Sequence, residues 1–252
     1  MVKGFESFRE WFAGFENCYT IIGGTACDLI MSEVDMDFRA TKDIDLVLII
    51  EALTPEFGKR FWEYISQAGY EHRNKSTGEP QFYRFSKPTS TSYPAMIELF
   101  SRKTDIIVLP QDAVLTPIPL DENISSLSAI LLDENYYQFL KAGKYTLNGV
   151  TILDAPYIIP FKMKAWLDLT NRRLKGEKID SKNIKKHKND IFRLSELLSP
   201  ATKITAPNSV FQDIKLFLDL IVNEDIDLKQ LGIRRTKEEI LARFNQVYIN
   251  HE

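Results

Sequence analysis

Two aspartates flank one isoleucine at the start of the apolar run Asp43-Ile44-Asp45-Leu46-Val47-Leu48-Ile49-Ile50. Side chains alternate between the faces of a strand, so Asp43 and Asp45 are predicted to project from the same face. Two like charges ~4–6 Å apart repel by about 3–4 kcal/mol at an effective dielectric near 20, which a hard cation such as Mg²⁺ would offset. The alternative is a pair of solvated acids at a strand entry, because Asp225-Ile226-Asp227 repeats the pattern in a predicted helical region without a glycine turn.

A third acid, Glu98, interrupts the apolar segment from Ala95 to Phe100. A buried carboxylate needs a partner, and two alternatives remain open. Either Arg102 or another base pairs with Glu98, or Glu98 completes a metal site with Asp43 and Asp45. Three carboxylates on neighbouring strands can bind two Mg²⁺ ions, one of which activates an attacking oxygen while both stabilise charge on a transferring phosphoryl group.

A Gly23-Gly24-Thr25 turn follows the apolar segment from Cys18 to Ile22, which is predicted to be a strand. Thr25 is a plausible N-cap for a helix that runs through Ile30. Glycines allow close approach of a ligand to the backbone, and the first N–H groups of a helix attract anions. Gly23, Gly24 and Thr25 are therefore candidate contacts for the phosphates of a nucleotide.

A basic stretch between Pro160 and Arg193 carries eleven Lys or Arg but only four Asp or Glu, in a chain whose net charge is −3. It could meet a polyanion such as a nucleoside triphosphate or RNA, or it could be a solvated helical surface. Lys162 and Arg172 are predicted to share one face of a helix, from which they could embrace a triphosphate.

Asp190 belongs to the next predicted helix of this stretch, four residues after Lys186. It could orient a basic residue or an acceptor hydroxyl, or it could form an ordinary ion pair on the helix surface. His187 falls on the apolar stripe of the same helix and is predicted to be a histidine at the edge of the core rather than a catalytic base.

These residues are positioned by an α+β fold. We expect a mixed α/β domain over residues 1–154, with flanking helices, and a helical domain over residues 155–252. Besides the strands above, the pattern predicts helices from Phe5 to Phe15, from Pro55 to Ala68 and from Asp133 to Ala142, and a hairpin from Gly143 to Leu153. Further strands are predicted at 81–85, 105–109 and 129–132, and helices at 160–174, 181–198, 207–222 and 236–247.

The motif Ile22-Gly23-Gly24-Thr25-Ala26, followed by Arg39-Ala40-Thr41-Lys42-Asp43-Ile44-Asp45, resembles the nucleotidyltransferase superfamily. Gly-Gly-Thr-Ala with Arg-x-Thr-x-Asp-x-Asp is most similar to the AbiEii-type toxin branch of abortive-infection systems. Lys162-Met163-Lys164-Ala165 and Lys186-His187-Lys188-Asn189-Asp190 match its downstream motifs more loosely.

The resemblance implies a nucleotidyltransferase-like sheet, in which Asp43, Asp45 and Glu98 are metal ligands and catalytic residues. It also implies that Gly24 and Thr25 meet the phosphates of a nucleoside triphosphate. Members of the superfamily transfer a nucleoside monophosphate to an acceptor, and some modify tRNA ends. A toxin would have a protein antitoxin as partner. The alternatives are transfer to a small antibiotic-like acceptor, and a module of the same fold that binds a nucleotide or a partner without catalysis.

The composition sets broad limits. Hydrophobic residues make up 44% of the 252 residues and charged residues 27%, which is typical of a globular protein. Cys18 and Cys27 lack metal-ligand spacing and are expected to be reduced core thiols. The apolar runs are too short to span a bilayer, and no secretory signal is visible, so we expect a cytoplasmic protein with no membrane partner.

Overall fold

The computed structural model describes residues 2–71, 84–100 and 133–251, and the chain divides into two compact units. The first unit comprises Met1–Asp121 and Lys144–Asp154, and the second comprises Glu122–Gly143 and Ala155–Glu252. Within the described residues, no helix has the length and apolar character needed to cross a bilayer.

A six-stranded mixed sheet forms the centre of the first unit, with strand order β3-β4-β2-β1-β6-β5. The strands are β1 (Tyr19–Ile22), β2 (Asp43–Leu48), β3 (Arg84–Ser86), β4 (Met96–Phe100), β5 (Lys144–Leu147) and β6 (Val150–Leu153). β2 runs parallel to β4 and β1 runs parallel to β6, while the other pairs are antiparallel. The predicted mixed α/β architecture is confirmed.

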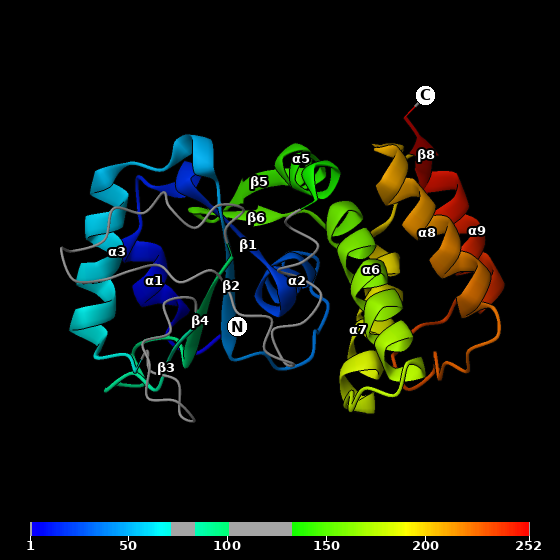
Figure 1. The fold of residues 1–252 in the computed structure, drawn as a ribbon, viewed down its shortest axis with the longest axis horizontal. Coiled ribbons are helices and arrows are strands. Elements are labelled where there is room, and N and C mark those ends of the chain that lie inside the picture. The colour runs from blue at the N-terminus through cyan, green and yellow to red at the C-terminus, as the bar shows by residue number, and fades with distance from the viewer. Residues whose placement is uncertain (1, 72–83, 101–132, 252) are drawn as a thin grey trace. The chain divides into compact units, whose positions relative to one another are not determined.

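Helices cover both faces of this sheet, with α1 (Phe5–Trp11) and α3 (Pro55–Ala68) on one face and α2 (Gly23–Ser32) on the other (Figure 1). Two single turns, η1 (Glu16–Cys18) and η2 (Ile50–Ala52), flank β1 and β2. An aromatic core joins α1, α3 and the sheet: the Phe12 ring lies 6.1 Å from that of Phe61, which lies 5.4 Å from Phe85. The face under α1 and α3 is therefore filled by aromatic side chains, and Asp45 lies on the face that carries α2, next to Gly23.

The residues at the ends of elements explain why the predicted helix at 55–68 and the predicted hairpin form. The Thr54 side chain accepts from the Phe57 N–H to cap α3, and Gly69 ends that helix in the left-handed region. In the predicted hairpin, Asn148 and Gly149 have φ values of 50° and 80°, as a two-residue turn between antiparallel strands requires.

The second unit is mostly helical, with a small parallel pair of strands that the sequence pattern did not predict. It also includes the helix at 134–143, which the predicted domain boundary had placed in the first domain. Its elements are α5 (Glu134–Gly143), α6 (Ala155–Leu174), α7 (Ser181–Leu194), η3 (Ser195–Leu197), β7 (Ile204–Ala206), α8 (Asn208–Ile221), α9 (Lys237–Val247) and β8 (Tyr248–Asn250). The predicted helix over 181–198 is thus interrupted, because its last turn tightens into η3.

Helix α6 begins five residues before the predicted start at Pro160. Proline has no N–H and cannot bond the carbonyl four residues earlier, which belongs to Pro156. The Tyr248 hydroxyl donates to that carbonyl at 2.7 Å, so the lost backbone bond is replaced from β8. The helix therefore continues through Pro160.

Several predictions fall on residues outside the described ranges. These are the strands at 105–109 and 129–132, residues 81–83 of the strand predicted at 81–85, and Arg102 as a partner for Glu98.

Candidate active site

The glycine turn packs directly against the second aspartate. Gly23 has φ +69°, and a Cβ added to it would stand 1.9 Å from Oδ2 of Asp45. A side chain at this position would therefore be strained by its backbone conformation and would collide with the carboxylate. Antiparallel pairing of β1 with β2 sets the contact, because Ile22 lies opposite Asp45 in the register.

The second glycine faces the segment before β2. A Cβ on Gly24 would stand 2.7 Å from Oγ1 of Thr41 and 3.4 Å from a terminal nitrogen of Arg39. The Arg-x-Thr part of the motif therefore lies over the first turn of α2. Arg39 and Thr41 belong to the sequence motif, but the motif alone indicated no role for them. A guanidinium at a helix N-terminus is chemically suited to phosphate.

Thr25 holds this arrangement together, though not in the predicted way. The expectation that Thr25 is an N-cap is wrong, because α2 already begins at Gly23 and its N-cap, Ile22, makes no side-chain cap. Instead the buried Thr25 hydroxyl donates to the backbone carbonyl of Asp43 at 2.5 Å. The side chain ties α2 to β2, so any contact of Thr25 with a phosphate must come from its backbone N–H.

The three predicted metal ligands belong to adjacent strands of one sheet. Parallel pairing of β2 with β4 places Asp45 opposite Glu98, and Asp43 opposite Met96. Residues opposite one another share a face, so Asp43, Asp45 and Glu98 lie on the same side of the sheet. The alternating residues Ile44 and Ile97 are fully buried, and their row continues to Phe85, which contacts α3.

Glu98 pairs with a base, as one of the two open alternatives predicted, and this base is Arg84. The two residues lie opposite one another in the antiparallel register of β3 and β4. Nε of Arg84 donates to Oε1 of Glu98 at 2.5 Å, and the side chains are 32% and 15% exposed. Arg84 was missed at the sequence level because its segment was recognised only as a strand.

The donor set of this face suits a hard cation, since carboxylate oxygens are the ligands that Mg²⁺ prefers. As the side chains stand, residues 2–71, 84–100 and 133–251 contain no group of three His, Cys, Asp or Glu that could hold a metal ion. One oxygen of Glu98 is bound by Arg84. The metal site formed by Asp43, Asp45 and Glu98 therefore stays a prediction, and Glu98 would have to share or leave its arginine to join it.

In the second unit, Lys162 and Asp190 form a buried ion pair between α6 and α7. Nζ of Lys162 lies 2.8 Å from Oδ2 of Asp190, and the two side chains are 7% and 0% exposed. Arg193 approaches the other oxygen at 4.0 Å. The alternative of an ordinary ion pair on the helix surface is wrong, because Asp190 points into the helix interface and Lys162 contributes the charge.

Arg172 occupies a different environment. Its Nε donates to Oε2 of Glu177, 2.7 Å away and just beyond the end of α6. Lys162 and Arg172 therefore each bind a carboxylate of the second unit. Their predicted role in holding a triphosphate, like that of Asp190, stays a prediction.

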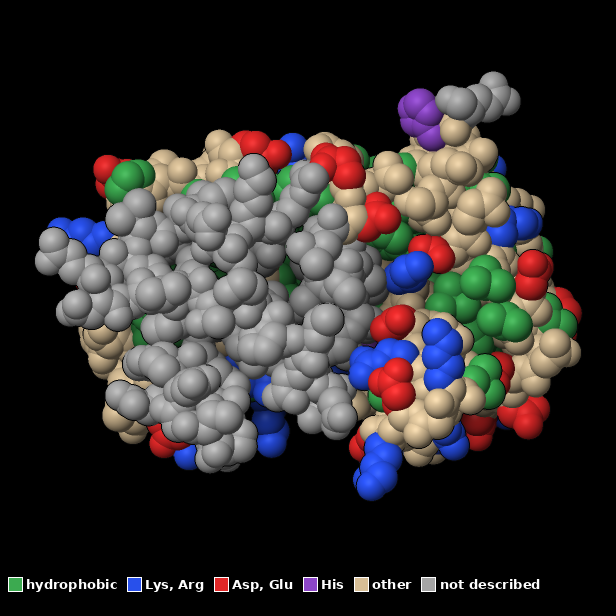
Figure 2. Space-filling model, in the orientation of Figure 1, with side chains coloured by type: hydrophobic (Ala, Val, Ile, Leu, Met, Phe, Trp, Pro, Cys, Tyr) green, Lys and Arg blue, Asp and Glu red, His purple; other side chains and the backbone are tan. Residues whose placement is uncertain are grey.

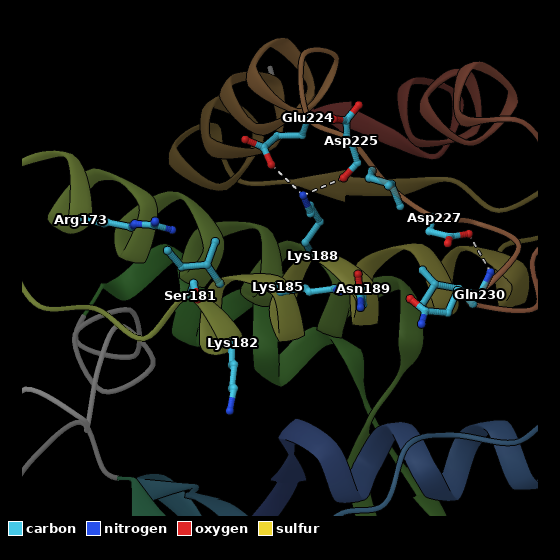
Figure 3. Close-up of a pocket in the computed structure, with 13 residues that line it drawn as sticks. Arg173, Ser181, Lys182, Lys185, Lys188, Asn189, Glu224, Asp225, Asp227 and Gln230 are labelled. Carbon is cyan, nitrogen blue, oxygen red and sulfur yellow. Dashed lines mark hydrogen bonds and ion pairs between the residues drawn. The ribbon is translucent and has the colours of Figure 1, made fainter.

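A groove of about 650 Å³ lies between α7 and the segment that follows α8 (Figure 3). One wall carries Arg173, Lys182, Lys185 and Lys188, and the other carries Glu224, Asp225 and Asp227. Lys188 joins the walls by donating to Oε2 of Glu224 at 2.7 Å and to the carbonyl of Asp225 at 2.9 Å. Asp227 accepts the Gln230 N–H at 2.9 Å, so the second Asp-x-Asp sequence has a structural role in a turn.

Charges on the second unit are mixed rather than uniformly basic. On the face shown in Figure 2, Lys and Arg side chains lie next to Asp and Glu side chains. The basic stretch predicted from the sequence is thus partly neutralised by acids that come from elsewhere in the chain, such as Asp213, whose carboxylate lies 2.9 Å from Nζ of Lys164.

Neither a scan against protein-family models nor a search of curated proteins finds a match for this chain. The motif residues and their geometry therefore carry the functional argument.

Proposed function

We propose that the protein is an Mg²⁺-dependent nucleotidyltransferase with a nucleotidyltransferase-like first unit. The observation that carries this proposal is the contact of Gly23 with Asp45 in a sheet that places Glu98 opposite Asp45. An anion site at a helix N-terminus thus adjoins a row of oxygen ligands, which is what a metal–triphosphate complex needs.

In the proposed reaction, the acceptor hydroxyl oxygen attacks the α-phosphorus of a bound nucleoside triphosphate and pyrophosphate leaves. Backbone N–H groups at Gly24 and Thr25 would hold the β- and γ-phosphates, and Arg39 lies close enough to Gly24 to contribute a cation there. Bound Mg²⁺ would supply charge stabilisation in the transition state. Asp43 and Asp45 would orient the complex from β2, so that positioning and electrostatics provide most of the rate.

Incubation with each labelled nucleoside triphosphate, Mg²⁺ and total tRNA tests this proposal. We expect transfer by the wild type and a loss of at least about 100-fold in Asp43→Asn and Asp45→Asn, as for removal of a group that stabilises transition-state charge. Asp219→Asn is the matched control, because Asp219 is an exposed aspartate of α8 that lies outside both the sheet and the groove. Transfer that survives Asp45→Asn undiminished would refute the proposed site.

The acceptor is the less constrained part of the proposal, and we favour RNA. The groove of the second unit presents Arg173, Lys182 and Lys185, which form no ion pairs with other described residues. The affinity for tRNA should then fall as salt rises. In a plot of log association constant against log salt concentration, each phosphate contact should contribute roughly 0.7–0.9 to the downward slope. Lys185→Glu should reduce both affinity and slope, whereas Lys215→Glu outside the groove should not. Binding without salt dependence would favour a small hydroxylated acceptor instead.

The resemblance to AbiEii-type toxins extends the proposal to biology. A toxin of this kind would arrest growth when expressed in the cytoplasm, and a protein antitoxin would relieve the arrest. Induction of the wild type should reduce colony formation, and induction of Asp45→Asn should not. Equal growth under both inductions would remove the toxin proposal while leaving the transferase proposal to the assay above.

A non-catalytic module is the second candidate, because Arg84 already occupies one oxygen of Glu98. In that case the protein would bind a triphosphate without turnover. Equilibrium binding of a non-hydrolysable triphosphate by the wild type, together with no transfer to tRNA or to small aminated and hydroxylated acceptors, would select this candidate.

A further inference from the structure

Three charged side chains form one row across three adjacent strands. Asp45 on β2 lies opposite Glu98 on β4, and Glu98 lies opposite Arg84 on β3. Neighbouring strands lie about 4.8 Å apart, so each side chain in the row is within reach of the next. Glu98 is therefore flanked by an acid on one side and by a base on the other.

The positive guanidinium of Arg84 partly offsets the negative charges of Asp45 and Glu98. Asp45 and Glu98 repel one another when both are ionised, and the ion pair at 2.5 Å reduces that repulsion. Both side chains of the pair are less than one-third exposed, so solvent screens the interaction only in part. Arg84 thus supplies a positive charge to the row.

We propose that Arg84 competes with the metal ion for Glu98 and so makes tight metal binding depend on the nucleotide; this inference rests on the metal site of the proposed function. A divalent cation bound between Asp45 and Glu98 would lie beside a positive guanidinium, which lowers its affinity. The phosphates of a triphosphate add negative charge to the same place and remove that penalty. Arg84 is a positioning residue in this scheme.

The chemistry of the guanidinium supports the exchange. Within the described residues, the guanidinium makes one hydrogen bond, from Nε to Glu98. A guanidinium carries five N–H donors. When Glu98 turns toward the cation, the same fork is free to donate to phosphate oxygens, which it suits in geometry and charge. The Arg84–Glu98 ion pair would thereby be replaced by two contacts, of Glu98 with the cation and of Arg84 with the phosphates. This exchange requires the metal and the triphosphate together.

Calorimetric titration of the full chain with Mn²⁺, with and without a non-hydrolysable triphosphate, tests the inference. In the absence of nucleotide, Arg84→Gln should bind Mn²⁺ about 10-fold more tightly than the wild type, because the competing charge is gone. The gain in Mn²⁺ affinity that nucleotide provides should shrink by a similar factor. Arg84→Lys keeps the charge and should stay within about threefold of the wild type.

Two further variants make the outcome unambiguous. Arg9→Gln removes another arginine of the first unit that pairs with a glutamate, Glu6 on α1, and should leave Mn²⁺ affinity unchanged. Should Arg84→Gln fold poorly by circular dichroism, Arg84→Thr provides a neutral side chain that favours strands. The inference is overturned if the neutral variants bind Mn²⁺ no more tightly than the wild type, or if Arg84→Lys tightens binding as much as they do.

Failure of the proposed function would look different. If Asp45→Asn binds Mn²⁺ as well as the wild type, or if the wild type binds none even with nucleotide, the metal site itself is refuted and the role of Arg84 with it. If Asp45→Asn loses Mn²⁺ while Arg84→Gln matches the wild type, only the role of Arg84 is refuted.

Discussion

Gly23 lies so close to Asp45 that a methyl group on the glycine Cα would collide with Oδ2 of the aspartate. Two elements that are distant in sequence, the start of α2 and the start of β2, thus meet where the proposed chemistry requires a phosphate next to a metal. A substitution at Gly23 therefore tests this contact directly.

Gly23→Ala should abolish transfer and destabilise the protein by about 1–3 kcal/mol, because a non-glycine residue is strained at φ +69° and the new methyl group displaces the carboxylate. Urea unfolding and the transfer assay measure the two effects. Gly14→Ala is the control, since Gly14 has φ +88° but no neighbouring atom of the described residues comes within 4 Å of its added Cβ. Loss of activity in both variants would trace the effect to general destabilisation.

Thr25→Val should lower the free energy of unfolding by about 1–2 kcal/mol and reduce transfer, because it removes the donor to the Asp43 carbonyl while keeping the shape of the side chain. Thr25→Ser retains the hydroxyl and should lose less of both. Chemical denaturation and turnover at saturating Mg²⁺ provide the comparison. Equal behaviour of the two variants would show that the hydroxyl does not secure β2.

Asp190→Ala should destabilise the second unit by about 3–5 kcal/mol, because it leaves the Lys162 charge buried without its carboxylate. The double variant Lys162→Met with Asp190→Leu should recover most of that loss. Thermal unfolding separates the two variants. Triphosphate binding by the recovered double variant then tests the predicted role of the pair: retained affinity would make the pair purely structural.

Tyr19→Phe should stabilise the protein by about 1 kcal/mol, because the buried Tyr19 hydroxyl has no hydrogen-bond partner among the described residues. Tyr64→Phe is the contrasting variant and should destabilise by a similar amount, because its hydroxyl lies 2.8 Å from that of Ser7. Equilibrium unfolding at pH 7 measures both. Destabilisation by Tyr19→Phe would contradict the assignment.

Stability should also fall as the pH rises above about 10. Burial, followed by the charge of Glu16, raises the pKa of Tyr19 well above its ordinary value, and burial together with Asp154 raises the pKa of Tyr145 to about 12. These hydroxyls ionise near pH 10 in the unfolded chain but at higher pH in the folded chain. Their contribution to the free energy of unfolding is therefore fully present below pH 10 and is lost as the pH rises above it. Unfolding free energies between pH 8 and 11.5 should decline less steeply in Tyr19→Phe. An unchanged slope would count against the buried hydroxyl as its cause.

Local chemistry explains what could be predicted from the sequence. Helix α3 could be predicted from Thr54 and Gly69, and the hairpin was predicted over residues 143–153. Caps and turns of this kind depend on residues close together in the chain. The common face of Asp43 and Asp45 followed from strand alternation alone. Such features need no knowledge of the partner elements.

The remaining features depend on pairing between distant segments. Arg84 reaches Glu98 only because β3 and β4 pair in one register, and a shift by one residue would place them on opposite faces. Lys162 meets Asp190 across a helix interface, 28 residues along the chain. The continuation of α6 through Pro160 likewise depends on Tyr248, which replaces a hydrogen bond that the local sequence cannot supply.

The order of elements has a consequence for how the protein is made. Strand β6, which pairs with β1 through Ile21 and Ile152, follows α5 in the chain, and α5 packs into the second unit through the contact of Tyr136 with Asp213. A ribosome therefore releases part of the second unit before it has supplied the last two strands of the first. The nascent chain therefore cannot complete one unit before it starts the other. A C-terminal fragment that begins at Ala155 would lack α5, which contacts Asp213 of α8 in the intact second unit.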